Sequence, residues 1–471
     1  MLSFIGRTKE LRMLDVAYRS SRSAFIPIYG RRRVGKSELI LRLLRDKPGI
    51  YFLGKKAQAG LQIREFLREA AVVLDEPLLA TFPAEGWKSA LEAVLERWGD
   101  RGKLVLAFDE FQWMVEASPE LPGVLQEYWD RRWKNQRNVM LILCGSYVGF
   151  MEREVLGQKS PLFGRRTAQI FLKPFGYREA ALFHPSCSLV DRAKIYFICG
   201  GIPLYLRYFS SHRSVEMNIG ATLLNELAPL YREPDFLLRE ELREVENYYA
   251  ILLAMASGAP TSREIAAWTG IGDRGLQYYL KQLMELGYVA RRYPLTGQPP
   301  VARHVRYSLE DPLLSFWFRF VYPNSSFILQ MGAERAISDR IRPDLEAYFG
   351  ACFERLCREA LPVLYAREGV SAGLEVGEYW DKSTQIDVVG LRDDGWTDIG
   401  ECKWGAVRSR KAVEAELQEK VERYPNPRNA TIGRRIFTRH KQPQASSRSP
   451  GVRWHSLEDL YAKDKTAPKR R

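Results

Sequence analysis

The sequence predicts an α/β protein of two or three domains, and three observations carry this prediction. The chain has 471 residues, which is too long for a single hydrophobic core. Near the N-terminus, an apolar strand, a glycine-rich turn and a helix with apolar periodicity follow one another. Near the C-terminus, an amphipathic helix precedes several short apolar strands. Short helices and a hairpin pattern separate these regions, so we expect a smaller helical domain between them.

The composition is that of a globular protein. Apolar residues make up 46% and aromatic residues 12% of the chain. No apolar run approaches the ~18 residues of a membrane-spanning helix, and residues 1–14 lack the pattern of a secretion signal. The six cysteines form no CxxC pair, and most lie in apolar runs, as buried free thiols do. We therefore expect a cytoplasmic protein that does not associate with membranes.

The charge is positive and unevenly distributed. The net charge is +14, and residues 403–471 alone hold 18 Lys and Arg against 7 Asp and Glu. A basic surface of this size attracts polyanions, with nucleic acid, and DNA in particular, as the favoured partner. The alternative is a solvated basic surface with unstructured segments, for which 444–450 and 463–471 have a typical composition.

A phosphate-binding loop is predicted near the N-terminus. Residues 23–29, SAFIPIY, are typical of a buried strand, and GRRRVGKS follows before a helical pattern. The motif GxxxxGKS between a strand and a helix defines a P-loop. Gly30 and Gly35 let the loop curl so that its N–H groups face phosphate oxygens. Lys36 would reach the β- and γ-phosphates of a nucleotide, and Ser37 would bind Mg²⁺.

Two further strands are expected to end in polar residues at the same site. Residues 103–114, KLVLAFDEFQWM, predict an apolar strand that ends in two acids. Burying Asp109 is unfavourable without a cation, so we expect it to order Mg²⁺, and Glu110 to polarise the attacking water. The strand NVMLILCGS ends at Ser146, which either senses the γ-phosphate or caps the strand.

Two arginines are candidates for stabilising transferred phosphate. Arg165 and Arg166 follow the loop-like segment PLFG. An arginine near the γ-phosphate, from the same subunit or from a neighbour in a homo-oligomer, would stabilise the transition state. The alternative is a surface salt bridge. Further on, the Gly-Gly-Ile-Pro turn at 200–203 is expected to be a hinge.

These motifs together resemble a known family. FIGRTKEL, GRRRVGKS, DEFQWM, CGS, LFGRR and GGIP, in that order, resemble the archaeal-type ATPases of the AAA+/STAND group of P-loop proteins. The resemblance covers residues 1–232. It implies a P-loop NTPase domain with a parallel sheet and a helical lid, expected over residues 1–235, and it implies ATP and Mg²⁺ as ligands.

The middle of the chain predicts a winged-helix domain over residues 236–325. One helix ends at Gly258, and a second starts at a Thr-Ser cap. A third begins near Asp273 and repeats leucine at helical spacing. A glycine-containing turn between the second and third helices is typical of a helix-turn-helix. Residues 290–309 then predict two strands around a Gly-Pro tip.

This domain has two interpretations. In one it binds DNA, with contacts from the third helix and from a basic hairpin. The helix residues are Arg274, Gln277, Tyr278 and Lys281, and the hairpin residues are Arg291, Arg292, Arg303 and Arg306. In the other it joins proteins or domains, because a winged helix serves both purposes. The aromatic segment at 309–324 is expected to pack as core between domains.

The C-terminal third predicts a second charged site. Residues 347–361 form an amphipathic helix with Glu354 in the middle of one face. Glu401 and Lys403 are two residues apart on one strand, so they share a face, and a hairpin would place Asp387 alongside. Asp387 and Glu401 would bind Mg²⁺ or Mn²⁺, and Lys403 would orient water or steady phosphate.

This pattern resembles the PD-(D/E)xK restriction-endonuclease-like fold. More closely, residues 347–455 resemble the domain of unknown function that often follows archaeal-type ATPases, and we expect it over 326–460, before a basic tail at 461–471. The fold's pattern of Glu, Asp and ExK is matched by Glu354, Asp387, Glu401 and Lys403, although the usual Pro before the Asp is missing. The resemblance implies nuclease chemistry, with a decayed fold kept for binding as the alternative.

Two functional hypotheses follow. The first is an ATP-hydrolysing enzyme that couples nucleotide state to DNA binding and to Mg²⁺-dependent phosphodiester cleavage. The second is a STAND-like nucleotide switch whose winged helix and catalytically silent C-terminal domain only bind DNA or protein. A small-substrate kinase ranks below both, because it would need neither the winged helix nor the C-terminal domain.

Overall fold

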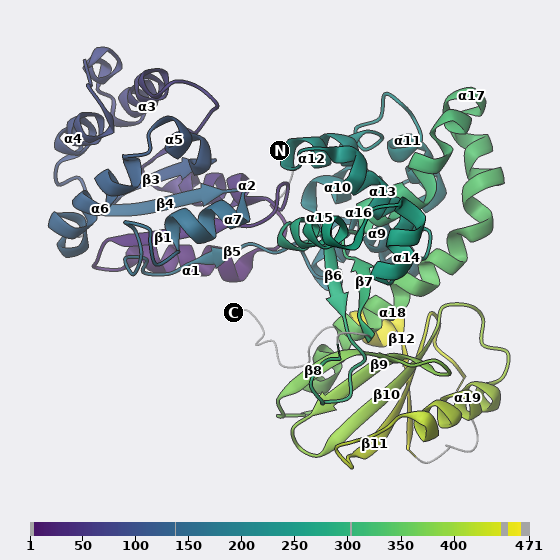
Figure 1. The fold of residues 1–471 in the computed structure, drawn as a ribbon. Helices are drawn as coiled ribbons and strands as arrows, with labels where there is room; N and C mark the ends of the chain where they lie inside the picture. The colour runs from purple at the N-terminus through teal and green to yellow at the C-terminus, as the bar shows by residue number, and fades with distance from the viewer. Residues whose placement is uncertain (1–3, 137, 302–303, 444–450, 463–471) are drawn as a thin grey trace. The chain divides into compact units, whose positions relative to one another are not determined.

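The computed structural model describes residues 4–136, 138–301, 304–443 and 451–462 (Figure 1). It divides into two compact units, Met1–Phe175 with Ile202–Leu204, and Gly176–Gly201 with Tyr205–Arg471. Residues 176–201 and 205–235, which the sequence analysis included in the first domain, therefore lie in the second unit. Arg303 and the segments 444–450 and 463–471 lie outside the described residues.

The first unit is built on a five-stranded parallel sheet, which confirms the predicted α/β class. The strand order is β2-β3-β4-β1-β5. The strands are β1 (Ala24–Tyr29), β2 (Gly49–Leu53), β3 (Leu104–Asp109), β4 (Val139–Gly145) and β5 (Ile170–Phe171). Every residue of β1, β3 and β4 is buried. Helices cover both faces of such a sheet, which explains why these strands are continuous apolar runs.

Aromatic side chains hold helices against this sheet. Phe66 and Trp87, from two helices, lie with their ring centroids 5.5 Å apart, and both contact Phe52 and Phe108 of β2 and β3. Edge and tilted contacts of this kind stabilise a core beyond the area that they bury. The helices of this unit are α1 (Thr8–Arg19), α2 (Lys36–Leu43), α3 (Ala59–Leu74), α4 (Trp87–Trp98), α5 (Phe111–Ala117), α6 (Leu121–Arg131) and α7 (Val148–Phe150).

The second unit begins with helices and one hairpin. The first helices are α8 (Tyr177–Ala180), α9 (Leu189–Cys199), α10 (Pro203–Tyr208), α11 (Val215–Leu223) and α12 (Glu233–Glu241), and the first two residues of α10 belong to the first unit. The predicted order of three helices and two strands follows as α13 (Val245–Ala256), α14 (Ser262–Thr269), α15 (Asp273–Glu285), β6 (Val289–Arg292) and β7 (Arg306–Leu309). Thr261 and Glu264 form a capping box at the start of α14, as the Thr-Ser cap predicted.

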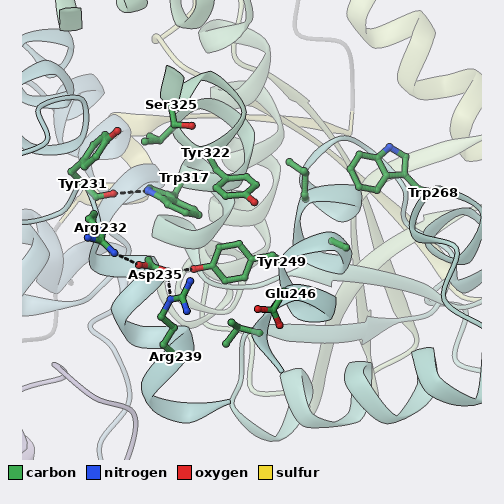
Figure 2. A pocket seen from close by; sticks show the side chains of 14 residues that line it. Tyr231, Arg232, Asp235, Arg239, Glu246, Tyr249, Trp268, Trp317, Tyr322 and Ser325 are labelled. Carbon is green, nitrogen blue, oxygen red and sulfur yellow. Dashed lines mark hydrogen bonds and ion pairs between the residues drawn. The ribbon is translucent and has the colours of Figure 1, made fainter. Parts of the chain in front are cut away.

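The aromatic segment after β7 packs as core. It forms α16 (Pro312–Phe316) and a π-helical turn, Trp317–Val321, whose hydrophobic side chains are almost all buried. Figure 2 shows Tyr249, Trp317 and Tyr322 around a pocket of about 520 Å³. Beside them Asp235 accepts hydrogen bonds from Tyr249 and from two arginines. Because Asp235, Tyr249 and the two arginines already pair with one another, we interpret this pocket as part of the packing.

A mixed sheet forms the C-terminal part of the second unit. Its order is β12-β11-β10-β9-β8, with β8 to β10 antiparallel and β10 to β12 parallel. The strands are β8 (Leu374–Trp380), β9 (Gln385–Arg392), β10 (Trp396–Lys403), β11 (Thr431–Thr438) and β12 (Val452–Ser456), and the helices are α17 (Ser325–Ala336), α18 (Arg342–Arg367), α19 (Arg410–Arg423) and α20 (Leu457–Tyr461).

Helices α18 and α19 pack on opposite faces of this sheet. Val389 of β9 belongs to the same core as Leu417 of α19. The next residue, Gly390, lies against Tyr365 of α18, where an added Cβ would be 2.3 Å from the hydroxyl oxygen. Successive strand residues point to opposite faces, which explains the two partners. Among the described residues, no helix is long and apolar enough to cross a membrane.

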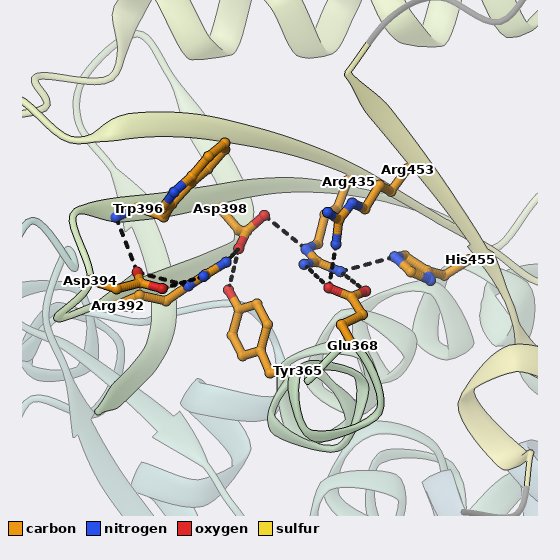
Figure 3. Close-up of polar contacts among 9 residues, drawn as sticks. All are labelled: Tyr365, Glu368, Arg392, Asp394, Trp396, Asp398, Arg435, Arg453 and His455. Carbon is orange, nitrogen blue, oxygen red and sulfur yellow. Dashed lines mark hydrogen bonds and ion pairs between the residues drawn. The ribbon is translucent and has the colours of Figure 1, made fainter. Parts of the chain in front are cut away.

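A buried charge network joins the end of α18 to the sheet (Figure 3). Arg435 of β11 is only 1% exposed. Its Nε donates to Asp398 Oδ1 at 2.9 Å, and its two terminal nitrogens donate to the Glu368 carboxylate at 2.7 Å each. Tyr365 donates to the other oxygen of Asp398 at 2.6 Å. Because a buried charge without partners is strongly destabilising, these contacts fix how α18 docks.

The network predicts a pH-dependent stability. Arg435 lies 3.1 Å from His455 Nε2, and because arginine can only donate, this nitrogen must be unprotonated. Burial, and then Arg435, lower the pKa of His455 from 6.5 to about 4. As the pH falls, His455 therefore becomes protonated in the unfolded chain before it does so in the folded protein. The free energy of unfolding should decrease as the pH is lowered from about 6.5 to about 4.

The variant His455→Gln isolates this effect, because a glutamine oxygen can accept the same hydrogen bond without titrating. Urea unfolding across that pH interval should show a smaller loss of stability in His455→Gln than in the wild type. His212→Gln, at an exposed position, should behave like the wild type. An equal pH-dependent loss in all three proteins would contradict the assignment.

Candidate functional site

The predicted phosphate loop lies between β1 and the start of α2. Gly30 and Gly35 have φ values of 150° and 92°, in the region that favours glycine. A Cβ on Gly30 would lie 2.3 Å from the carbonyl oxygen of Leu172, so only glycine fits there. Helix α2 begins at Lys36, which places its free N–H groups at the loop. The loop therefore has the shape and the polarity to hold phosphate.

Lys36 is held over this loop. Its side chain is 5% exposed, and Nζ donates to the carbonyl oxygens of Gly30 and Arg31 at 2.9 and 2.8 Å. Burial lowers the pKa of Lys36, while nearby groups that include Glu110 and Asp109 oppose the shift. Phosphate oxygens would be stronger partners for this ammonium than the two carbonyls.

Asp109 and Ser37 meet as the sequence predicted. Asp109 is fully buried, and its Oδ2 accepts hydrogen bonds from Ser37 Oγ at 2.5 Å and from Tyr51 Oη at 2.7 Å. Its Oδ1 accepts from the backbone N–H of Glu110 at 2.9 Å. Burial, and then the charge of Asp109, raise the pKa of Tyr51, so the phenol remains a donor. A carboxylate beside a hydroxyl, held by neutral donors, suits Mg²⁺.

Sequence reasoning missed Tyr51. It lies in β2, the strand next to β3, and that strand was not predicted. The available signal was the short apolar run Gly49–Leu53, in which a half-buried tyrosine would need a partner for its hydroxyl.

Glu110 is held in an unusual conformation. Its φ of 50° lies in the left-handed region, which residues other than glycine adopt at a cost of about 1–3 kcal/mol. Ser146 Oγ donates to its Oε1 at 2.5 Å, and Gln112 donates to its Oε2. Ser146 therefore contacts the predicted base, a role that neither sequence interpretation included, and Gln112 was not predicted at all. Backbone strain and two donors fix the carboxylate beside Asp109.

The two candidate arginines differ. Arg165 donates to both carboxylate oxygens of Asp130, with a shortest distance of 2.6 Å, and to the carbonyls of Pro161 and Phe163. This is the salt bridge that the sequence allowed as the alternative, and it occupies the whole guanidinium. Arg166 is exposed. Burial raises the pKa of Tyr29, at the end of β1, and the positive charge of Arg166 acts to lower it. Of the two, Arg166 is the better candidate for phosphate contact.

The predicted hinge also reaches the loop. Ile202–Leu204 belong to the first unit, although the residues on both sides belong to the second. Pro203 lies 3.7 Å from the position that a Cβ on Gly35 would occupy. The Gly-Gly-Ile-Pro turn therefore places a proline directly against the phosphate loop.

The second site lies at the end of the C-terminal sheet. The antiparallel register pairs Gly400 with Val388, and its continuation sets Glu401 opposite Asp387. The backbone N–H of Cys402 donates to Asp387 Oδ2 at 2.9 Å. Burial raises the pKa of both carboxyl groups, and for Glu401 the charge of Asp387 adds to the effect. The hairpin predicted from the sequence thus brings the two acids together.

Two lysines compensate the buried Glu401, which is 3% exposed. Lys403 Nζ lies 2.8 Å from its Oε1, and Lys420 Nζ, from α19, lies 2.5 Å from its Oε2. Both lysines also pair with Glu416. Lys420 was not identified from the sequence, because no local pattern distinguishes it from the other charged residues of α19.

Glu354 completes the set of four predicted residues. Burial, and then Asp387, raise the pKa of Glu354 from 4.5 to about 8. Glu378 of β8 also raises the pKa of Glu354. Arg358, which pairs with Glu378 at 3.5 Å, acts to lower it. Glu354, Asp387, Glu401 and Lys403 thus lie in one electrostatic cluster, which we call the carboxylate cluster. Sequence reasoning missed Glu378 and Arg358.

The carboxylate cluster is not a closed metal cage. Within the described ranges, no three Asp, Glu, His or Cys side chains are grouped as metal ligands. Mg²⁺ usually binds through one or two carboxylates and takes its other ligands from water and phosphate. Asp387 and Glu401 offer such a pair, and Mn²⁺ at this position stays a prediction.

The helix α15 exposes the face predicted to contact DNA. Leu276, Leu280 and Leu283 are fully buried, so the face of α15 that carries them points toward the core. The four predicted contact residues are exposed: Arg274, Gln277, Tyr278 and Lys281. The helix is therefore amphipathic in the sense that the DNA-binding interpretation requires.

The arginines of the basic hairpin differ: Arg291 is exposed and donates to Gln277 of α15, whereas two others are held by packing. Arg292 pairs with Glu310 at 2.7 Å, and Arg306 lies over the ring of Trp380, 4.6 Å from its centroid. At the hairpin tip, the backbone N–H of Leu295 donates to the carbonyl of Glu378 at 2.8 Å. The hairpin is therefore docked on the C-terminal sheet, which favours the inter-domain interpretation for this element.

Comparison with known proteins gives two family matches. Residues 4–209 match an ATPase domain predominantly from Archaea, and residues 317–415 match a family of archaeal and bacterial proteins of unknown function. A relative from Methanocaldococcus jannaschii, the uncharacterized protein MJECL04, is 30% identical over 427 residues, which span 88% of this chain and 91% of the relative.

Two solved structures are also similar. The Walker-type ATPase of Pyrococcus abyssi is 19% identical, with a TM-score of 0.49 over 67% of this chain and 96% of that one. The ORC2 protein of Aeropyrum pernix is 14% identical, with a TM-score of 0.46 over 70% of this chain and 96% of that one.

The Tyr51 contact predicts a measurable effect on magnesium. Tyr51→Phe removes one of the donors that orient Asp109. Since a hydrogen bond to a charged group contributes about 1.5–3 kcal/mol, half-maximal ATP hydrolysis should require about tenfold more Mg²⁺. Tyr18→Phe is the control, because the Tyr18 hydroxyl donates to the carbonyl of Lys103 instead. The same magnesium dependence in both variants would refute the role of Tyr51.

Proposed function

We propose that ATP hydrolysis by this chain controls nucleic-acid binding by its second unit. The chain belongs to the same family as the Methanocaldococcus jannaschii relative and carries an ATPase domain predominantly from Archaea. The observation that carries the ATPase part is the direct contact of Ser37 with Asp109, beside a held Glu110. The observation that carries the binding part is the exposed basic and aromatic face of α15.

The residues of the first unit have distinct roles in this proposal. The loop N–H groups and Lys36 bind the phosphates. Ser37 and Asp109 would hold Mg²⁺, which would supply positive charge to the phosphates. Glu110, fixed by Ser146 and Gln112, orients the attacking water and accepts its proton. Arg166 is the arginine that would stabilise the transferred phosphate.

The helical part of the second unit supports a winged-helix assignment. Helices α13 to α15 and the strands β6 and β7 have the order of that fold, in which the last helix contacts the major groove. The exposed α15 residues can donate to phosphates and bases. Since the hairpin is docked on the C-terminal sheet, we assign DNA contact to α15 and domain coupling to the hairpin.

Duplex binding in two nucleotide states tests this proposal. The wild type should bind duplex DNA with different affinities in ATP and in ADP. Lys36→Ala should lose the difference, because it no longer holds the phosphates. Glu110→Gln should hydrolyse ATP at least about 100-fold more slowly and remain in the ATP-like state. Arg274→Glu should weaken binding about tenfold in both states.

Arg213→Glu, at an exposed position in the same unit, is the matched control for charge reversal. Equal affinity in ATP and ADP for the wild type would reject the coupling. Equal weakening by Arg274→Glu and Arg213→Glu would reject the assignment of α15.

A second candidate function is phosphodiester cleavage. The convergence of Glu354, Asp387, Glu401 and Lys403 at one end of the sheet favours it, because PD-(D/E)xK-like nucleases use this set of residue types. In such a site Lys403 would steady the attacked phosphate or its water. The competing role for the same domain is binding without cleavage, as in a nucleotide switch.

Cleavage of labelled single- and double-stranded DNA distinguishes these roles. With Mg²⁺ or Mn²⁺, cleavage should disappear in Lys403→Ala and in Asp387→Asn. Lys411→Ala, an exposed lysine of α19, should cleave like the wild type. If the wild type hydrolyses ATP and cuts no substrate under these conditions, the C-terminal domain has the binding role.

A further inference from the structure

The second unit contains a basic pocket that no motif in the sequence predicted. Its volume is about 580 Å³, within the range of about 300–1,000 Å³ typical of ligand sites. The end of α13, strand β7 and helix α18 form its walls. Glu378 and Gln385, from β8 and β9, lie at the side of the C-terminal sheet. We call it the arginine pocket.

Four arginines line the arginine pocket against two acids. The arginines are Arg292, Arg306, Arg319 and Arg355, and the acids are Asp344 and Glu378. An excess of positive charge in a concave, partly apolar site raises the local concentration of anions.

Two of these arginines share one carboxylate, that of Glu310. Glu310 lies 2.7 Å from Arg292 and 3.1 Å from Arg355. Arg355 also donates to the backbone carbonyls of Leu309 and Glu310 at 2.9 Å each. These contacts hold the pocket wall rather than a ligand.

The other two are available to an anion. Arg306 has no carboxylate within ion-pair distance among the residues that the structure describes, and its guanidinium stacks on Trp380. Arg319 lies 3.7 Å from Asp344 and 3.3 Å from the carbonyl of Ala256, both weak contacts. A guanidinium stacked on an aromatic ring keeps its N–H edge for phosphate.

The arginine pocket adjoins the carboxylate cluster. Glu378 lines the pocket, and its charge also acts on Glu354. Gln385 lies on β9 two residues before Asp387. Tyr307 and Tyr348 add aromatic side chains to the lining. A ligand in the pocket would therefore have anionic groups near the arginines and would extend toward the cluster.

We propose that the arginine pocket binds a segment of single-stranded nucleic acid, with a phosphate between Arg306 and Arg319, and directs it to the carboxylate cluster. This inference rests on the proposed nucleic-acid function. A site of this volume encloses a nucleotide-sized segment rather than a base-paired helix. Basic side chains along a concave site supply the sequence-independent phosphate contacts of single-strand binding. Duplex contact through α15 and strand contact here are separate sites.

Fluorescence anisotropy with a labelled single-stranded oligonucleotide tests the inference. Arg306→Glu and Arg319→Glu should each raise the Kd about tenfold. Arg306→Gln should reduce the slope of log K against log salt by about one, as expected when one phosphate contact is lost. Arg274→Glu should weaken duplex binding and leave single-strand affinity unchanged. Arg213→Glu is the charge control, and thermal unfolding identifies any variant that fails to fold.

The outcomes separate the two proposals. If the wild type binds neither duplex nor single strand, the nucleic-acid function and this inference both fail. If the wild type binds single strands and the Arg306 and Arg319 variants match Arg213→Glu, only the arginine pocket is refuted. Inorganic phosphate can be added at the same concentration as the phosphate groups of the oligonucleotide. Displacement of the oligonucleotide under these conditions would identify a free-phosphate site and would also overturn the inference.

Discussion

The burial of carboxylates at the ends of central strands determines how both sites are built. Asp109 ends β3 and is fully buried, and Glu401 lies near the end of β10 with 3% of its surface exposed. A buried carboxylate without partners is destabilising by several kcal/mol, so each must be surrounded by donors. Ser37 and Tyr51 meet this requirement for Asp109, and Lys403 and Lys420 meet it for Glu401. The choice of donor is what makes the two sites differ.

Neutral and charged donors have different electrostatic consequences. Two hydroxyl groups donate to one oxygen of Asp109 and a backbone N–H donates to the other, and because these donors are neutral, the site still attracts a cation that accompanies phosphate. The ammonium groups around Glu401 cancel its charge, and the nearby arginine pocket adds positive charge. Under the proposed nucleic-acid function, this positive charge would let a polyanion approach the carboxylate cluster despite its acids.

The sequence predicted those parts of the fold and sites that local spacing determines. The P-loop pattern places Ser37 at the start of α2, and the two-residue spacing of Glu401 and Lys403 puts both on one strand face. Tyr51 and Lys420 were missed because their partners are distant along the chain, and only strand order or helix docking brings them together. Arg165 shows the converse: its motif was visible, but its partner Asp130 lies on another element.

The partners of the basic hairpin were also missed because they depend on contacts between distant parts of the chain. This dependence has a functional consequence. Positive charge on a hairpin suggests DNA contact, yet the choice between Glu310 and a phosphate as partner depends on tertiary packing. Glu354 and Arg355 are consecutive residues of α18, so their side chains point about 100° apart around the helix axis. One serves the carboxylate cluster and the other holds the wall of the arginine pocket. Because a single rigid helix carries both, any displacement of α18 must alter the two sites together. Glu310 also ties the hairpin to this helix, because it pairs with Arg292 of β6 as well as with Arg355 of α18.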